Sequence, residues 1–142
     1  MRKIKNPWIN KEGYHCFGCC PDNPIGIHME FYEDGDDILS FWNPHQHYQG
    51  WIDTMHGGIL STIIDEIAGW VVLRKLQTCG VTSRLEVSYR KPIMTTEPQI
   101  IENSQGEICT SGTATYFTFD KERSKSMGFT SCDLDREELL SM

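Results

Sequence analysis

Residues 55–70 read MHGGILSTIIDEIAGW, and this stretch decides the fold. From Gly57 to about Leu76, apolar residues recur every three or four positions, which is typical of an amphipathic helix. The stretch opens with a histidine and two glycines, and it carries two adjacent acids, Asp65 and Glu66, inside the apolar run. The sequence therefore predicts one long, largely buried helix with a carboxylate near its middle.

The two acids fall on different sides of this predicted helix. Glu66 lies at the border of the apolar face, which favours a structural or hydrogen-bonding role. Asp65 lies among small or weakly polar residues such as Ser61 and Gly69, with no Lys or Arg before Arg74. Since a solvated helix face usually carries long charged side chains, we expect a second subunit to pack here and partly desolvate Asp65. An ordinary surface aspartate is the alternative. The predicted core face consists of Ile59, Leu60, Ile63, Ile64, Ile67, Ala68, Trp70 and Val71.

The two glycines suit a helix start that binds a ligand. The first N–H groups of a helix have no acceptor within it and carry positive partial charge, so they can stabilise an oxygen that becomes negative. Glycine allows a ligand to come close to the backbone. His56 and Asp65 are separated by about 13 Å of helix, so they cannot act on the same atom within one chain. If both serve one site, Asp65 must come from another chain.

The flanking sequence predicts strands. Residues 27–31 alternate between apolar and polar types, and Asp34-Gly35 is typical of a hairpin turn before a second strand. After the helix, Val81, Leu85, Val87 and Tyr89 are expected on one side of a strand, and Thr82, Arg84, Glu86, Ser88 and Arg90 on the other. The predicted order of two strands, one long helix and three strands indicates an α+β fold with an antiparallel sheet. The strands are expected over 27–31, 37–42, 80–92, 97–103 and 107–119.

Length and composition indicate a single domain over residues 1–142. Residues 1–26 are expected to be an irregular N-terminal segment, and residues 120–142 a C-terminal turn (DKERSKS) and a short helix with Asp133 as a possible N-cap. The net charge of −7 disfavours nucleic-acid binding. Neither a membrane span of ~20 apolar residues nor a signal peptide is found in the sequence, so we expect no membrane partner and a cytoplasmic protein.

The six cysteines are expected to be free thiols in a reducing compartment. The stretch HCFGCC contains one CxxC pair, Cys16 and Cys19. A zinc site normally needs a second pair with similar spacing, which Cys79, Cys109 and Cys132 do not supply. We therefore expect no metal here and a structural loop packed on the sheet.

HGGILSTIID, followed by GVTSRLEVSYRKPI, resembles the hotdog-fold acyl-CoA thioesterases of the phenylacetate-pathway and 4-hydroxybenzoyl-CoA type. Upstream, CFGCCPDNPIGIHMEF and YQGWIDTMHGG resemble the branch with a Cys-rich N-terminal segment, so the resemblance covers about residues 14–119. It implies a hotdog fold, in which a curved antiparallel sheet wraps around one long central helix. It also implies a homodimer with two shared sites, often paired into a homotetramer. No cofactor is expected, because coenzyme A enters as part of the acyl-CoA substrate.

The resemblance also implies roles for individual residues. Gly57 would give its N–H to the thioester carbonyl, and His56 would hold the glycine turn. Asp65 of the partner chain would be either the nucleophile or the general base that activates water. Thr82 matches a position at which a hydroxyl assists near the attacking group. The implied activity is hydrolysis of an acyl-CoA to the free acid and CoA.

One position departs from the family pattern. Related enzymes often carry Asn or Gln six residues before the histidine, where this chain has Gly50, preceded by Gln49. Losing an oxyanion donor lowers activity by ~10²-fold, so a non-catalytic acyl-CoA or small-ligand binding protein is the alternative. A hydratase or dehydratase is disfavoured because His56 is expected to be occupied with the glycines. Candidate substrate-binding residues are Gln49, Gly58, Gly80, Arg84, Arg90 and Lys91. The three cations among them are expected to bind the phosphates of coenzyme A. The alternative is that they are ordinary exposed charges at strand ends.

Overall fold

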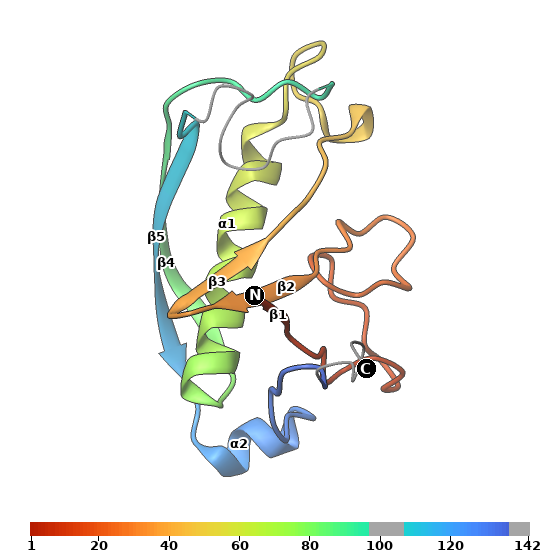
Figure 1. Cartoon of the computed structure of the whole chain (residues 1–142), viewed down its shortest axis with the longest axis vertical. Helices are drawn as coiled ribbons and strands as arrows, with labels where there is room; N and C mark the ends of the chain where they lie inside the picture. Colours follow the sequence, from red (N-terminus) through yellow and green to blue (C-terminus); the bar gives the residue numbers. More distant parts are fainter. Residues whose placement is uncertain (97–106, 137–142) are drawn as a thin grey trace, which may run out of the picture.

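The computed structural model describes residues 1–96 and 107–136. Its longest element is helix α1 (Gly57–Val71), which continues into a π-helical turn, η2 (Val72–Leu76). These bounds confirm the helix predicted from Gly57 to about Leu76. In Figure 1 this helix runs along the long axis of the molecule, between the strands β4 and β5 on one side and the hairpin of β2 and β3 on the other.

The described strands pair in two antiparallel groups. Strands β1 (Arg2–Lys3), β2 (Phe31–Asp34) and β3 (Asp37–Ser40) form one, and β4 (Gly80–Tyr89) and β5 (Thr110–Thr118) form the other. Short helical segments are η1 (Gln46–Tyr48) and α2 (Lys121–Ser126). The predicted α+β arrangement, one long helix packed against antiparallel strands, is confirmed. The strand predicted over 97–103 lies outside the described residues.

The N-terminal part differs from its prediction in two places. Residues 1–26 are not wholly irregular, because β1 pairs with β2. The strand predicted over 27–31 is wrong in its bounds, since the ladder begins only at Phe31. His28 has a φ of 60°, which breaks the extended backbone, and the N–H groups of Ile27 and Met29 donate to Phe17 and Gly18 instead. Alternate burial is kept, and Ile27, Met29 and Phe31 are all core residues.

The charged run predicted as a turn within 120–142 is the helix α2. Asp120 caps it by accepting a hydrogen bond from the Arg123 N–H, and such a cap stabilises a helix start by about 1 kcal/mol. Ser124 is the one buried residue of the run; its hydroxyl accepts from the Cys79 N–H. The short helix predicted after Asp133 falls mostly outside the described residues, and the Asp133 carboxylate accepts from the Ser131 hydroxyl.

A β-bulge in β4 overturns part of the predicted alternation. Thr82 pairs with Tyr116 and Arg84 pairs with Thr115, so Ser83 is an extra residue on the β4 side. Because of the extra residue, the alternation between the two sides of the strand changes at the bulge. Thr82, before it, and the half-buried Leu85, after it, therefore both face the helix. Val81, predicted to share a side with Leu85, is instead 49% exposed.

The apolar face of α1 forms the core with β2 and β3. Leu60, Ile63, Ile64 and Trp70 are buried as predicted, and Trp70 stacks on Phe31 of β2 with ring centroids 4.5 Å apart. The helix end deviates, because Val71 is 40% exposed and Val72 is buried in its place. In the part of the chain that the structure describes, no helix is long and apolar enough to cross a bilayer.

An ion pair holds the far end of the helix. The Arg74 Nε donates to Glu33 of β2 at 2.5 Å, and its Nη1 donates to the Cys132 carbonyl at 2.9 Å. The hydrogen bond from Arg74 lowers the pKa of the Glu33 carboxyl below its ordinary value. A carboxyl whose pKa falls on folding stabilises the fold above its unfolded pKa of about 4.3, and this contribution is lost as the pH falls through the folded value.

We expect Glu33→Gln to lower the free energy of unfolding by about 1 kcal/mol at neutral pH, because Arg74 loses its charged partner. The difference from wild type should begin to shrink as the pH falls below the unfolded pKa of about 4.3, and it should vanish once the pH has passed through the lowered folded pKa. Urea unfolding at several pH values measures this. Glu30→Gln, which removes a more exposed pair with Lys3, is the control and should change little. A gap that stays constant down to pH 3 would contradict the assignment.

Candidate functional site

The start of α1 presents a backbone donor. His56 is the N-cap, and its Nδ1 accepts the Gly58 N–H at 2.9 Å, while its carbonyl accepts from Ile59 and Leu60. Among the described residues, none accepts the Gly57 N–H. This follows from its place as the first helical residue, where the N–H has no partner within the helix. The histidine therefore orders the turn and leaves one polarised donor for a ligand.

Tyr89, at the end of β4, closes one side of this helix start. Its hydroxyl donates to the Gly57 carbonyl at 3.0 Å and also hydrogen-bonds the Ser61 hydroxyl. A hollow of about 280 Å³ lies here, and Gly57, Tyr89, Arg90 and Lys91 are among the residues that line it. Two of the three predicted phosphate-binding cations thus lie beside the predicted oxyanion donor.

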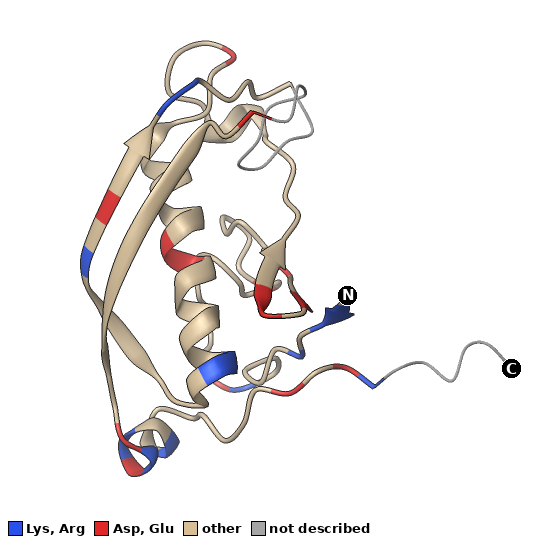
Figure 2. Cartoon of the chain, turned by 60° about the vertical axis from the view of Figure 1, so that its left-hand side comes forward, with Lys and Arg blue, Asp and Glu red and all other residues tan. Residues whose placement is uncertain are grey.

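Asp65 is half-buried and anchored through one oxygen. The Thr82 hydroxyl donates to its Oδ1 at 2.5 Å, and the Tyr116 hydroxyl lies 3.3 Å from the same atom and 2.8 Å from the Asp65 carbonyl. No described residue donates to Oδ2. Burial raises the pKa of Tyr116 to about 12, which keeps its proton available for donation. In Figure 2 the two acids of α1 form the red band near the middle of the helix.

The small residues on the Asp65 side of the helix also have an explanation within the chain, while the expected covering of this side by a second subunit stays a prediction. Ser61 contacts Tyr89, and a Cβ on Gly69 would lie 3.2 Å from the Tyr116 hydroxyl oxygen. The stripe Ser61–Asp65–Gly69 therefore packs on β4 and β5 of its own chain. Small side chains allow the two tyrosines to approach the helix.

Asp65 and Gly57 do not share a hollow. Asp65 lines a second one, of about 400 Å³, together with Gly80, Thr82 and Tyr116. Gly57 is not among its lining residues, and Asp65 is not among those of the first hollow. The structure therefore keeps the two predicted halves of the site apart within one chain, as the helix rise requires.

Three further predicted residues have partners within this chain. The Gln49 side-chain oxygen accepts the Asp53 N–H at 3.1 Å. Arg84 pairs with Glu86 on exposed β4, and Lys91 pairs with Glu107.

The two predicted glycines are accounted for by local packing. A Cβ on Gly80 would lie 2.9 Å from the Phe117 carbonyl, so strand pairing explains this glycine. A Cβ on Gly58 would lie 3.0 Å from the His56 Nδ1, so the capping contact itself favours glycine there.

Sequence reasoning missed Tyr89 and Tyr116 as site residues. Both were visible only as strand residues, and their contacts with α1 depend on the pairing register. Tyr116 lies directly opposite Thr82 in the ladder. Knowledge of that register, which the sequence does not contain, is the signal that would have found it.

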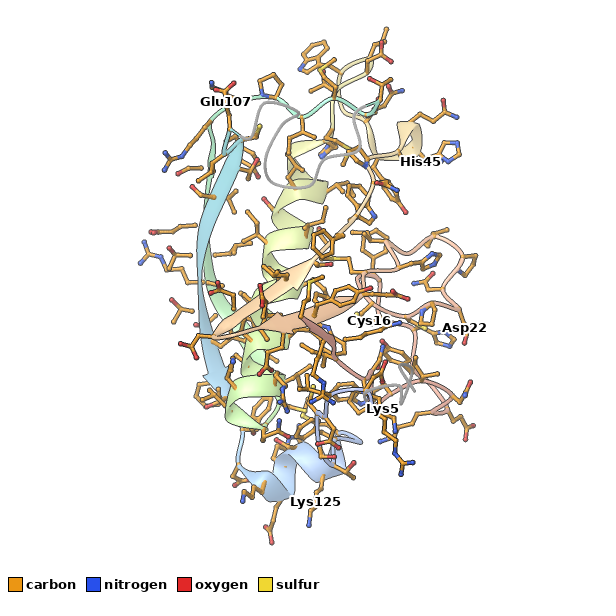
Figure 3. All side chains as sticks on the ribbon, viewed as in Figure 1. Lys5, Cys16, Asp22, His45, Glu107 and Lys125 are labelled. Atoms are coloured by element: carbon orange, nitrogen blue, oxygen red, sulfur yellow. The ribbon has the colours of Figure 1, made fainter. Side chains whose placement is uncertain are left out.

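The Cys-rich segment also reaches the second hollow. Cys16 lies 3.5 Å from Glu66 Oε1, which accepts from the Trp70 indole at 3.2 Å, so the predicted hydrogen-bonding role of Glu66 is confirmed. The hydrogen bond with Cys19 lowers the pKa of Cys16, and the same bond together with burial raises that of Cys19. Figure 3 labels Cys16 on the side of α1 away from β5 in this view. Both thiols and Glu66 line the hollow of Asp65.

Comparison with known proteins agrees with this arrangement. Residues 53–102, which include α1 and β4, match the family model described as Thioesterase superfamily. No curated protein matches the chain. The crystal structure of a thioesterase superfamily protein superimposes with a TM-score of 0.62 at 18% identity, over 74% of this chain and 60% of that chain.

At 18% identity, the structural similarity is evidence for the fold alone. The chain spans 60% of the length of that protein. The matched segment contains Gly57, Asp65 and Thr82, so the helix and strand that carry the candidate site are also those that match the family. Over residues 53–102 the chain is similar to the thioesterase superfamily, and its α+β arrangement is that of the hotdog fold.

Proposed function

We propose that this protein hydrolyses an acyl-CoA thioester to the free acid and CoA, at a site shared by two chains of a homodimer. The observation that carries the proposal is the pair of features on α1: an unaccepted N–H at Gly57 and a half-buried carboxylate at Asp65 with one open oxygen. The match of residues 53–102 to the Thioesterase superfamily model supports it. Such dimers can pair further into tetramers.

In the proposed reaction, the thioester carbonyl oxygen accepts the Gly57 N–H of one chain. Charge that develops on this oxygen is stabilised by the N–H and by the positive end of α1, while His56 holds the turn. Asp65 of the partner chain faces the carbonyl carbon through Oδ2. Thr82 and Tyr116 fix Oδ1, so the carboxylate is oriented before substrate arrives.

Two routes fit this arrangement. As a general base, Asp65 takes a proton from water, the water oxygen bonds to the carbonyl carbon, and the C–S bond breaks as CoA leaves with a proton. As a nucleophile, Asp65 bonds to the carbonyl carbon and expels CoA, and water then cleaves the resulting anhydride. Both routes release the same acid and CoA.

A second chain is required because Gly57 and Asp65 lie too far apart along α1. About 13 Å of helix lies between the two groups, whereas reacting atoms must approach to roughly 3 Å. An antiparallel arrangement of two α1 helices would bring the start of each near the middle of the other. This places two equivalent sites in one symmetric dimer.

Arg90 is the strongest candidate for a coenzyme A phosphate. It lines the hollow at Gly57, and no carboxylate among the described residues pairs with its guanidinium. Arg84 and Lys91 would have to leave Glu86 and Glu107 to bind a phosphate. Lys91 shares the same hollow and is the second choice.

Non-catalytic binding of an acyl-CoA is the second candidate, and one observation favours it. Residue 50 lies beside the helix start, since a Cβ there would be 3.4 Å from the His56 Cα. An amide side chain at this place could add a second carbonyl donor, but the residue is glycine. The neighbouring Gln49 has its side-chain oxygen committed to Asp53.

Wild-type protein should release free thiol from at least one member of a broad acyl-CoA panel. We expect Asp65→Asn to lower kcat by at least about 10²-fold, because the amide neither takes a proton nor attacks. Glu122→Gln, at an exposed acid of α2, is the control. Equal inactivity of wild type and Asp65→Asn across the panel, with saturable ligand binding by calorimetry, would instead establish the binding protein.

The Gly57 donor can be removed without removing the helix. Proline suits the first helical position, and His56 already has the extended backbone that precedes proline, at φ −65° and ψ 130°. We expect Gly57→Pro to lower kcat by about 10²-fold through loss of the N–H. Gly57→Ala keeps the N–H, and its Cβ would meet the Tyr89 ring at an ordinary 3.4 Å, so it should retain most activity. Equal losses in both variants would argue against the donor role.

Mixing the two inactive variants tests whether the site is shared. A heterodimer of Asp65→Asn and Gly57→Pro chains contains one site with both native residues and one with neither. Random reassortment should therefore restore about a quarter of wild-type activity per chain. Two differently tagged chains, co-expressed and purified through both tags, should give about half. Activity that stays at the level of the parents would show that each chain uses its own residues.

A further inference from the structure

Three groups that ligate metals meet beside α1. Cys16 and Cys19 come from the N-terminal segment, and Glu66 comes from the helix, fifty positions after Cys16. Their ligand atoms all lie within 4.8 Å of one another. The proposed hydrolysis uses none of the three. The prediction of a metal-free loop considered only a second cysteine pair as the source of further ligands, whereas the fold supplies a carboxylate.

We propose that Cys16, Cys19 and Glu66 bind a zinc ion, with water in the fourth position. Zinc binds thiolates at about 2.3 Å and carboxylate oxygens at about 2.0 Å in a tetrahedron, which sets the sulfur–oxygen edge at about 3.5 Å. The Cys16 Sγ lies 3.5 Å from Glu66 Oε1. The two groups are therefore already spaced as an edge of the coordination tetrahedron.

The turn that carries the two cysteines lies close against Glu66. The Cys20 N–H donates to the Cys16 carbonyl at 3.0 Å and closes the turn. A Cβ on Gly18 would lie 2.4 Å from the Glu66 Cδ, so a larger residue here would push the carboxylate away from this turn.

Neighbouring side chains orient the ligands. The Asn6 amide donates to the Tyr14 oxygen at 2.9 Å, which directs the Tyr14 hydroxyl hydrogen to the Cys19 sulfur, also at 2.9 Å. The Trp70 indole donates to Glu66 at 3.2 Å. Such supporting hydrogen bonds fix ligand orientation in metal sites, and losing one typically weakens binding by about 10- to 100-fold.

The carboxylate of this cluster also has no positively charged partner among the described residues. Glu66 is half-buried, and no Lys, Arg or His of the described ranges forms an ion pair with it. A zinc ion would place positive charge in direct contact with this carboxylate, which a Cys16–Cys19 disulfide would not, and the two cysteines would each release a proton on binding. Zinc would then fasten the N-terminal segment to the residue next to Asp65.

Metal binding by the whole chain tests the proposal without any substrate. Protein purified with a thiol reductant, stripped with a chelator and reloaded with zinc should hold about one ion per chain by mass spectrometry. Cobalt(II) in place of zinc should give a sulfur-to-cobalt charge-transfer band in the near ultraviolet and the visible d–d bands of a tetrahedral site. Because neither readout needs turnover, an inactive thioesterase would leave this result standing.

Matched variants separate ligands from neighbours. Cys16→Ser and Cys19→Ser should abolish the charge-transfer band, and Glu66→Gln, which can still accept from Trp70, should weaken zinc binding by at least about tenfold. Cys20→Ser and Asp65→Asn are the controls: Cys20 bonds the Tyr14 carbonyl, and Asp65 bonds Thr82 and Tyr116. Both controls should keep zinc at the wild-type level.

The results that overturn the proposal are distinct. Folded wild-type protein, verified by circular dichroism, that takes up neither zinc nor cobalt would exclude the site. Equal zinc loss in Cys16→Ser and Cys20→Ser would exclude the assigned ligands. A Cys16–Cys19 disulfide that forms in air at the same rate with and without zinc, shown by peptide mass mapping, would identify a redox pair in place of a metal site.

Discussion

The fixed rise of α1 is the constraint on which the rest of the candidate site depends. A helix with its apolar face buried against β2 and β3 cannot bend to bring its start to its middle. The unaccepted N–H of Gly57 and the carboxylate of Asp65 are therefore held apart, and they line different hollows. Because the helix is rigid, neither group can reach the other within one chain.

The same helix presents two adjacent acids to two different sets of contacts. Asp65 faces β4 and β5, where hydroxyl groups hold it, and Glu66 faces the Cys-rich segment, where thiols and an indole contact it. Successive helical residues diverge by about 100°, so two neighbouring acids reach two environments. The carboxylate that looked redundant in the sequence is thus explained by a second set of contacts.

Local patterns predicted the elements well where one element decides them alone. The helical period fixed Gly57–Leu76, and the HGG start correctly marked its beginning. The charged run at 121–126 looked like a turn because its stability comes from the Asp120 cap and from Ser124 buried against a distant loop. Contacts such as Tyr116 with Asp65, or Cys16 with Glu66, join segments fifty or more positions apart and depend on register and loop approach.

The bulge at Ser83 has a consequence for how this chain is compared with others. Before the bulge the even-numbered residues face the helix, and after it the odd-numbered residues do. The hydroxyl that contacts Asp65 therefore belongs to Thr82 only because the strand has one extra residue. In a relative with a regular strand, the residue facing the helix would be aligned one position away. An alignment without a gap at the bulge would therefore match Thr82 to a solvent-facing residue. Inheritance of this contact has to be traced through strand pairing, since the column of an alignment does not record it.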